Sequence, residues 1–273
     1  MGVRILLPPS EAKATGGDGP ALRAAGFGDG PLAPVRQAVL TAVAELCRDD
    51  PAAAAAALKL PPGRAEEDLA RNVAVLEAPT LAALDRFTGV VYAALDPATL
   101  PLGARAVADR SVMIVSGGFG LLGATDAVPD HRVGMAVTVP GLGPLTPLWR
   151  GHLRALMPTV FAGGQLVVDL RSSDYAAVLT ATGPLRRAVV VVRVLTERRV
   201  GRKWVRRVVS YSSKQVKGQV ARELILAEAA GTPIEAVEDV EKVAVNAGFT
   251  VERRSTPGAG TALDVVLRET GRR

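Results

Sequence analysis

Short apolar segments closed by glycine or proline alternate along this chain with longer segments of helical periodicity, and this alternation constrains the fold most. Residues 4–7 end at Pro8-Pro9, residues 112–115 lead into a glycine turn, and residues 166–170 are a third short apolar segment. Strands that alternate with helices are typical of mixed α/β folds. Since neither a repeat nor a long linker interrupts the pattern, the sequence predicts one α+β domain over residues 1–273, with a central sheet flanked by helices.

The remaining elements follow from periodicity and from turn residues. Helices are expected over residues 34–48, 52–58, 65–77, about 80–87, 149–157, 214–230 and 235–247. A further strand is expected over residues 133–139. Two hairpins are expected, one pairing 189–195 with 204–211 and the other pairing 249–254 with 262–268.

Composition excludes several classes of protein. Hydrophobic residues make up 48% of the 273 residues and charged residues 22%, as in globular proteins. No apolar run approaches the roughly 18–20 residues that cross a bilayer, and the start of the chain lacks a signal-peptide core. We therefore expect a cytoplasmic protein without a membrane partner. Cys47 is the only cysteine, and His131 and His152 lack metal-binding spacing, so no disulfide, metal or cofactor is predicted.

Positive charge is concentrated in one part of the chain. Between Arg186 and Arg222 there are twelve basic residues and one acid, Glu197, which gives +11, whereas the other 236 residues sum to −5. Such a window indicates an anionic partner, either nucleic acid or another phosphate-bearing ligand. The alternative is a solvated arginine-rich surface. The basic residues are Arg186, Arg187, Arg193, Arg198, Arg199, Arg202, Lys203, Arg206, Arg207, Lys214, Lys217 and Arg222.

A glycine string after the 112–115 strand has the spacing of a dinucleotide-binding loop. Residues 118–123 read GFGLLG, which fits GxGxxG. A dinucleotide site also needs an acid about 20 residues later, at the end of the next parallel strand. The next strand expected here ends in Thr138-Val139-Pro140, which has no acid. A tight turn where backbone approaches backbone is therefore preferred.

Three segments that follow expected strands carry candidate functional groups. Lys214 and Lys217 stand at the expected start of a helix, where backbone N–H groups and ammonium groups could hold an anion together. Lys13 follows the first strand in the segment PSEAK and could clamp an anion. Asp174, in the segment DLRSSDY, could act as a general base, although ordinary helix capping fits it equally well.

These segments together resemble the YaaA peroxide-stress protein family. Six blocks carry the resemblance in order along nearly the whole chain: PSEAK at 9–13, FTGVVYAAL at 87–95, SGGFGLL at 116–122, HRVGM at 131–135, LRSSDY at 170–175 and YSSKQVKG at 211–218. Five positions depart from the family pattern: His131 replaces a tyrosine, Gly134 a glutamate and Ala94 a glycine, and Gly123-Ala124 replaces Arg-Pro.

The resemblance implies one mixed α/β domain with a basic cleft, a cytoplasmic role in protection against peroxide, and binding of double-stranded DNA. It also implies a helix-hairpin-helix element, which would here span residues 52–72. Lys59, Arg64 and Arg71 are its basic residues, and the acids Glu66, Glu67 and Asp68 would oppose a phosphate contact. If the substituted positions serve a catalytic cleft, this member has altered or lost that chemistry.

Two functions remain open from the sequence. The first is a stress-response protein that binds DNA mainly through phosphate contacts. The second is an enzyme that acts on an anionic, nucleotide-like small molecule, with Lys13, Asp174 and Lys214 as catalytic candidates. The expected DNA- or anion-binding residues are Lys13, Arg132, Lys214, Lys217, Lys59 and Arg64. The sequence does not set the oligomeric state. A third idea, iron handling, lacks the carboxylate cluster it would require.

Overall fold

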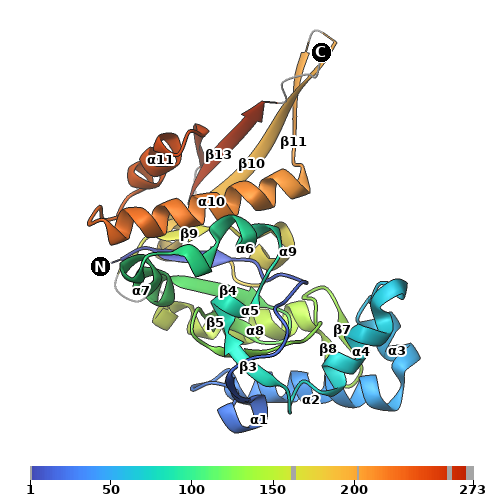
Figure 1. The fold of residues 1–273 in the computed structure, drawn as a ribbon. Coiled ribbons are helices and arrows are strands. Elements are labelled where there is room, and N and C mark those ends of the chain that lie inside the picture. Colours follow the sequence, from blue (N-terminus) through green and yellow to red (C-terminus); the bar gives the residue numbers. More distant parts are fainter. Residues whose placement is uncertain (1, 161–163, 202, 257–259, 269–273) are drawn as a thin grey trace.

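An eight-stranded mixed sheet forms the centre of the computed structural model, which describes residues 2–160, 164–201, 203–256 and 260–268 (Figure 1). Strand β1 (Arg4–Leu7) lies inside the sheet and pairs in parallel with β4 and β9. Strand β11 pairs with β10 beside the main path. The order along the sheet is β12 (Thr250–Thr256), β13 (Gly260–Arg268), β10 (Val189–Val200), β9 (Val167–Asp169), β1, β4 (Val112–Ser116) and β5 (Gly120–Gly123), with β11 at Lys203–Arg207.

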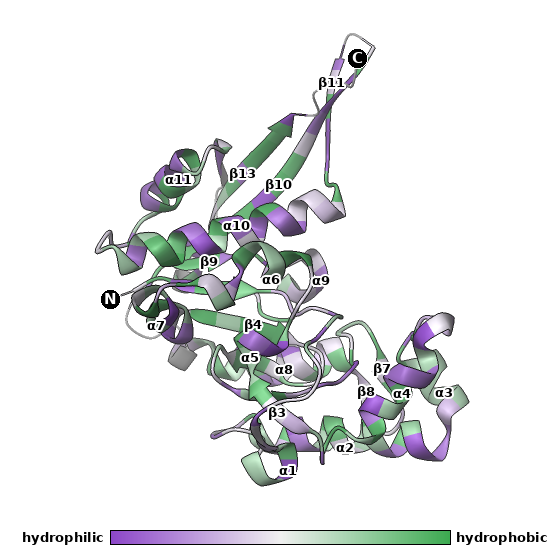
Figure 2. Ribbon diagram, viewed as in Figure 1, coloured by the Kyte–Doolittle hydropathy of each residue, from purple (hydrophilic) through white to green (hydrophobic). Residues whose placement is uncertain are grey.

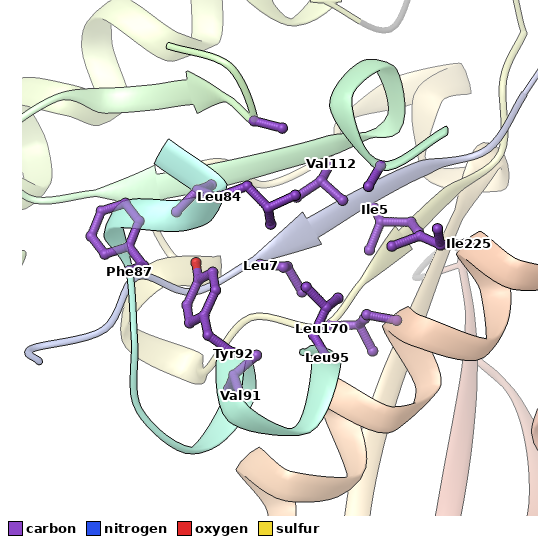
Figure 3. Close-up of a cluster of buried hydrophobic side chains, with 14 of the residues drawn as sticks. Ile5, Leu7, Leu84, Phe87, Val91, Tyr92, Leu95, Val112, Leu170 and Ile225 are labelled. Atoms are coloured by element: carbon purple, nitrogen blue, oxygen red, sulfur yellow. The ribbon is translucent and has the colours of Figure 1, made fainter. Parts of the chain in front are cut away.

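Helices cover both faces of this sheet, so the central strands are buried on both sides. Successive side chains of β1 point to opposite faces. Ile5 and Leu7 therefore join one hydrophobic cluster, and Leu6 joins the other. The first cluster lies under α6 (Val90–Leu95), α7 (Leu102–Ser111), α10 (Ser210–Ala229) and α11 (Val237–Asn246). Figure 3 shows Ile5 and Leu7 packed toward α6 and α10. The second cluster lies under α2 (Ala33–Asp49) and α8 (Leu145–Val160).

A glycine allows α10 and α6 to cross in close contact. A Cβ atom on Gly218 would lie 2.1 Å from the backbone oxygen of Val91 and 2.7 Å from the Cβ of Ala94. Only glycine fits this position without moving a helix, because an added methyl group would overlap backbone atoms.

Two small sheets and a helical pair complete the molecule beside the main sheet. One sheet contains β2 (Gly19–Ala21), β3 (Pro79–Ala82) and β6 (Ala127–Pro129), and the other contains β7 (Thr138–Val139) and β8 (Gly143–Pro144). The helical pair consists of α3 (Pro51–Ala57) and α4 (Ala65–Val73), with a 3₁₀ turn at Pro62–Arg64 between them. Short helices lie at Leu22–Ala25 (α1), Ala83–Arg86 (α5) and Ser173–Ala176 (α9), and further 3₁₀ turns lie at Pro97–Thr99 and Gly183–Ala188.

The far end of β10 and its partner β11 project from the sheet as a two-stranded ribbon (Figure 1). We call residues 196–207 the arm. Strand β9 ends at Asp169, which pairs with Val191, whereas β10 continues to Val200. The arm therefore extends beyond the carboxyl ends of the parallel strands. Figure 2 shows the change from hydrophobic strands inside the sheet to a hydrophilic arm.

The predicted fold class is confirmed, with a central mixed sheet flanked by helices. The predicted hairpin of residues 249–254 with 262–268 forms, and helix α2 lies within one residue of its predicted bounds. In the other hairpin residues 196–200 pair with 203–207, whereas the prediction paired 189–195 with 204–211. None of the helices in the described residues is long and apolar enough to span a membrane.

Several predicted elements are wrong in extent or type, including the helix predicted over 149–157, which is α8 over Leu145–Val160. Residues 133–137 form a loop that contains a turn at Met135-Ala136, and only Thr138–Val139 belongs to a strand. The predicted helix at about 80–87 is strand β3 followed by the short α5, and the helix predicted over 65–77 ends at Val73. Helix α10 begins at Ser210, so Lys214 and Lys217 lie beyond its first turn. These lysines therefore do not stand at a helix start, as the prediction had placed them.

Candidate ligand site at the carboxyl edge of the sheet

Three of the sequence blocks meet at one edge of the sheet. Strands β1, β4 and β9 are parallel, with Ile5 opposite both Val112 and Val168. Because the strands run in one direction, the loops that follow them leave from the same edge. These loops carry the PSEAK segment after β1, the glycine turn after β4 and the LRSSDY segment after β9.

The loop that carries Lys13 is fixed by backbone pairing to the chain around Phe87. Lys13 and Phe87 form an antiparallel bridge, and the N–H of Thr88 donates to the oxygen of Ala12 at 3.0 Å. The fully buried Arg86 guanidinium donates to the backbone oxygens of Ala14 and, at 2.7 Å, Gly16. The Lys13 backbone is therefore held by interactions that do not use its own side chain.

The amine of Lys13 lies in a partly enclosed position among weak partners. Its Nζ donates to the backbone oxygen of Ser10 at 3.1 Å and lies 5.4 Å from the centre of the Phe87 ring. The pKa of this amine falls from 10.5 to about 7, chiefly because of burial. The neighbouring cations Arg132 and Arg71 also lower it, while Asp130 and Asp68 oppose the shift. Near neutral pH a large fraction of Lys13 is therefore the uncharged amine.

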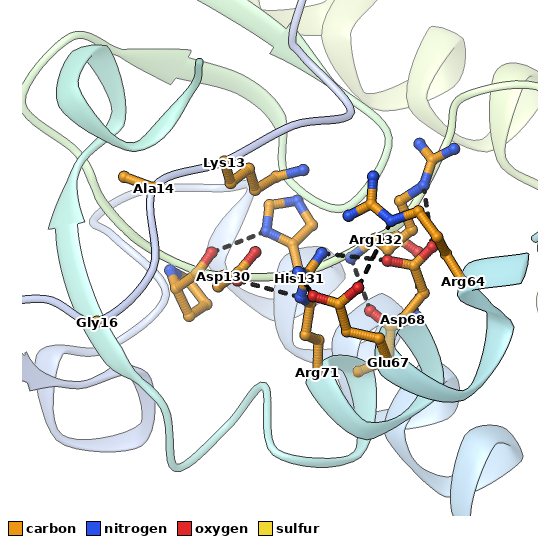
Figure 4. A network of polar contacts seen from close by, with 12 residues as sticks. Lys13, Ala14, Gly16, Arg64, Glu67, Asp68, Arg71, Asp130, His131 and Arg132 are labelled. Atoms are coloured by element: carbon orange, nitrogen blue, oxygen red, sulfur yellow. Dashed lines mark hydrogen bonds and ion pairs between the residues drawn. The ribbon is translucent and has the colours of Figure 1, made fainter. Parts of the chain in front are cut away.

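A network of ion pairs lies beside Lys13 (Figure 4). Arg132 contacts Glu11 at 2.9 Å and Asp68 at 3.7 Å, and Arg71 contacts Asp68 at 3.2 Å and Asp130 at 3.3 Å. The Glu11 side chain is 80% exposed, whereas that of Asp68 is 2% exposed. The Glu11 contact can therefore be replaced from solvent, while the Asp68 contacts belong to the interior.

Asp130 holds one oxygen that lacks a partner. Its Oδ1 is buried and accepts no hydrogen bond from a described residue, while its Oδ2 faces Arg71. An unsatisfied buried carboxylate oxygen costs free energy, and such groups occur at functional sites more often than elsewhere.

His131, which replaces the tyrosine of the family pattern, is a buried neutral side chain. Its Nδ1 lies 2.9 Å from the oxygen of Pro129, and its ring contacts Phe119 edge-on at 5.2 Å between centroids. Burial, with Lys13 nearby, holds the pKa of His131 well below its usual range. Since the neutral ring donates from Nδ1 to Pro129, its Nε2 is an acceptor facing Gly118.

The glycine string is the tight turn that the sequence favoured. Residues 120–123 form strand β5, which runs antiparallel to β4, and no dinucleotide-binding helix follows the turn. A Cβ on Gly117 would lie 2.5 Å from the carbonyl group of Gly134. Backbone thus approaches backbone where the 131–135 segment passes the turn.

Asp174 does not contact the ion-pair network among the described residues, but the next residue, Tyr175, lies close to it. Asp174 is exposed on α9, and no contact joins it to Lys13 among the described residues. Burial raises the pKa of the adjacent Tyr175 phenol. The charges of Glu11 and Asp174 also raise this pKa, and the charge of Arg132 lowers it. Tyr175 therefore connects the LRSSDY segment to the network.

The two lysines of α10 have different positions. Lys217 reaches the loop after β9, donating to the oxygen of Arg171 at 2.6 Å, and burial lowers its pKa from 10.5 to about 8. Arg171 itself is held by both oxygens of Asp169. Lys214 is exposed, and no contact with another described residue ties it to Lys13 or Asp174.

The expected hairpin residues make contacts of their own. Lys59, in a left-handed conformation with φ of 55°, donates its Nζ to the oxygen of Ala136 at 2.6 Å. Arg64 lies 3.5 Å from Glu67. Asp68, expected to oppose a phosphate, is buried and pairs with arginines instead.

Sequence reasoning missed several members of the site. Asp130 stands next to His131-Arg132 in the sequence and could have been included on that ground. Asp68 and Arg71 are separated from Arg132 by about sixty residues, and Arg86 carried no local signal. Three or more His, Cys, Asp or Glu side chains suited to a metal ion do not gather anywhere in the described ranges.

Comparison with known proteins identifies relatives over almost the whole chain. The profile of the family described as "Peroxide stress protein YaaA" matches residues 3–254. The chain is 36% identical over 267 residues to the UPF0246 protein SCO2297 of Streptomyces coelicolor, which covers 97% of this chain and 98% of that protein. It is 34% identical over 252 residues to the UPF0246 protein Cgl1995/cg2186 of Corynebacterium glutamicum, covering 91% and 94%. With matches of this extent, the chain belongs to the YaaA family of peroxide stress proteins.

Proposed function

We propose that this chain protects against peroxide stress by binding double-stranded DNA through phosphate contacts, with the arm as the principal contact. The name of the family supports a stress-related role. The observation that carries the DNA proposal is the arm itself, a projecting ribbon on which Arg198, Arg199 and Lys203 are exposed and form no ion pair with a described residue.

The chemistry of the arm suits a nucleic-acid backbone. A two-stranded ribbon fits the width of a major groove. Its one acid, Glu197, is 6% exposed and is neutralised by Arg206 and Arg268. Trp204, 54% exposed, adds an aromatic surface between the charges. Arg202 lies outside the described residues.

Part of the basic window serves the fold instead. Arg193 pairs with Asp264, and Arg222 donates to the backbone oxygens of Leu95 and Asp96. These charges are neutralised or fixed within the molecule, so the proposal rests on the arm rather than on the total of +11.

The α3–α4 hairpin is the second proposed DNA contact, in the manner of a helix-hairpin-helix element. Its turn could offer backbone N–H groups to a phosphate. Glu66 and Glu67 border the hollow beside this turn, together with Arg64, and they weaken its attraction for a phosphate. We therefore expect the hairpin to contribute less than the arm.

Fluorescence anisotropy of a labelled duplex at several salt concentrations tests this proposal. The arm variant Arg198→Ala/Arg199→Ala/Lys203→Ala is expected to bind more weakly and to reduce the slope of log K against log salt by about 3, since each phosphate contact contributes about 0.9. The matched control Arg48→Ala/Arg110→Ala/Arg154→Ala removes the same charge from other exposed positions. Equal weakening by both triple variants would contradict a defined DNA surface.

A second candidate function is catalysis on an anionic small molecule at the carboxyl edge of the sheet. One observation favours it, which is the partly uncharged Lys13 amine beside Arg132 and the unpartnered oxygen of Asp130. Strand ends of parallel sheets are common ligand sites in α/β proteins.

A further inference from the structure

The Lys13 amine lacks the partner that buried lysines usually have. Its hydrogen bonds go to the backbone oxygens of Ser10 at 3.1 Å and Glu11 at 3.4 Å, and none of the described carboxylates lies within ion-pair distance of it. Backbone oxygens orient the nitrogen without neutralising a charge. This arrangement holds a lysine in place while leaving its lone pair available.

The surroundings favour the neutral, nucleophilic form of that amine. Five titratable groups interact electrostatically with Lys13. They are Asp130, Asp68, Arg132, Arg71 and the neutral His131. Burial and the two arginines together outweigh the two carboxylates, and the pKa falls to about 7. Lysines that form imines in enzymes are activated in these same two ways, by desolvation and by a neighbouring cation.

Arg132 offers an anion-binding position next to the amine. Glu11 holds its Nη2 at 2.9 Å but is largely exposed, so an incoming carboxylate or phosphate can take its place. Asp68 keeps the guanidinium in position from the other side, with Nε 3.7 Å from its Oδ2. Figure 4 shows Lys13 and Arg132 around His131, and the charge of Arg132 acts on the Lys13 amine.

We propose that Lys13 condenses with a small carbonyl compound that carries a carboxylate or phosphate group, and that Arg132 holds the anionic group. This inference deepens the second candidate function and rests on it. The nitrogen lone pair attacks the carbonyl carbon, forming a C–N bond and breaking the C=O π bond, and a proton moves from nitrogen to oxygen. Loss of water then gives the imine, so the reaction is amine plus carbonyl to imine plus water, without oxidation or reduction.

Asp130 is the group placed to carry the protons of this condensation. Its Oδ1 is the buried acceptor without a hydrogen bond. Because Asp130 lies beyond ion-pair distance of the amine, a proton leaving the ammonium or the carbinolamine nitrogen would reach this oxygen through an intervening water molecule before it passes to the departing hydroxyl group.

Borohydride trapping in the full chain tests the proposal. Pyruvate and glycolaldehyde phosphate serve as the carboxylate and phosphate probes, propanal as the neutral probe, and mass spectrometry locates the reduced adduct. With either anionic probe we expect trapping at Lys13 to exceed trapping at the exposed Lys214 and Lys242 by about tenfold or more, because the lowered pKa leaves far more free amine at Lys13. The two anionic probes show whether a carboxylate or a phosphate is preferred.

Two variants test the roles of the neighbouring residues. Glu11→Gln frees Arg132 and is expected to increase trapping of the anionic probes several-fold without changing that of propanal. Lys13→Arg is expected to abolish the dominant adduct, and circular dichroism checks that this variant is folded. Lys13→Met serves if it is not.

The outcomes separate this inference from the function on which it rests. Equal labelling of all lysines, or an adduct that persists in Lys13→Arg, overturns imine formation at Lys13. If pyruvate or glycolaldehyde phosphate raises the melting temperature but no adduct forms at Lys13, the anionic-ligand function stands and the imine falls. If no probe stabilises the protein and none is trapped at Lys13, both fall, whereas DNA binding is judged by the arm variant alone.

Discussion

Burial of the Lys13 amine links the stability of this fold to pH. In the unfolded chain the amine has its ordinary pKa of 10.5, and in the folded chain its pKa is about 7. Below pH 7 both states are protonated, and the cost of burying the charge is fully present. Between pH 7 and 10.5 only the unfolded state binds the proton, so this group makes the free energy of unfolding rise with pH.

Replacement of Lys13 by methionine is expected to remove this dependence. Lys13→Met should exceed the wild type in free energy of unfolding by the largest amount near pH 6. This difference should become smaller toward pH 10. Urea denaturation across this range measures it, with the exposed Lys242→Met as the matched control. Lys217 is present in all three proteins and cancels in the comparison. A Lys13→Met curve parallel to the wild-type curve would contradict the shifted pKa.

Gly218 sets the contact between α10 and α6, and its replacement is expected to be costly. In Gly218→Ala the new methyl group would meet the Val91 oxygen, so α6 must move, at a cost of about 1–3 kcal/mol. Gly103→Ala on α7 is the matched control, since a Cβ there meets nothing within 4 Å and alanine favours a helix. Denaturant unfolding of both variants gives the comparison, and equal stability of the two would disprove the close crossing.

The arm is an element that the rest of the fold does not need. All five residues of β11 are exposed, and the strand pairs only with β10 among the described elements. A variant in which residues 198–205 are replaced by Asn-Gly keeps the neighbouring Glu197 and Arg206. We expect its melting temperature to stay within a few degrees of the wild type, because little buried area is lost. A much larger fall would mean that the arm packs against the body.

Elements stabilised by neighbours in sequence were predicted well, and elements that depend on distant partners were not. The β12–β13 hairpin and helix α2 carry their signals locally. The β10–β11 hairpin was predicted with the wrong pairing, because residues 189–195 pair with the distant strands β9 and β13. Residues 133–139 do alternate between buried and exposed, as a strand would, because they pack across the second hydrophobic cluster. A strand also needs a partner, and the period alone does not reveal whether one is present.

The same distinction explains which part of the candidate site could be predicted. Lys13 and Arg132 stand in blocks that the sequence singled out. Asp68 was expected only to oppose a phosphate contact at the hairpin, and only the fold shows that it is buried against Arg132. Lys214 was predicted with them because the start of α10 was placed four residues too late.

At the scale of the whole molecule, the two proposed sites lie at the same edge of the main sheet, where its parallel strands end. Strand β10 runs past the carboxyl end of β9 to form the arm, and the Lys13 loop leaves the sheet from that carboxyl edge. The two sites nevertheless share no residue, so variants can separate them.

Survival of cells exposed to hydrogen peroxide is the property that joins these sites to a biological role. In a strain that lacks its own member of the family, wild-type protein is expected to restore survival and the arm variant to fail, because DNA would no longer be held. The 48/110/154 triple variant, matched in charge, should protect. Cys47→Ala should also protect, since the Cys47 thiol is 2% exposed and burial raises its pKa, which disfavours reaction with peroxide. If the arm variant protects fully at equal protein abundance, peroxide resistance does not depend on the arm. A parallel assay of Lys13→Arg would then show whether resistance depends on the Lys13 amine instead.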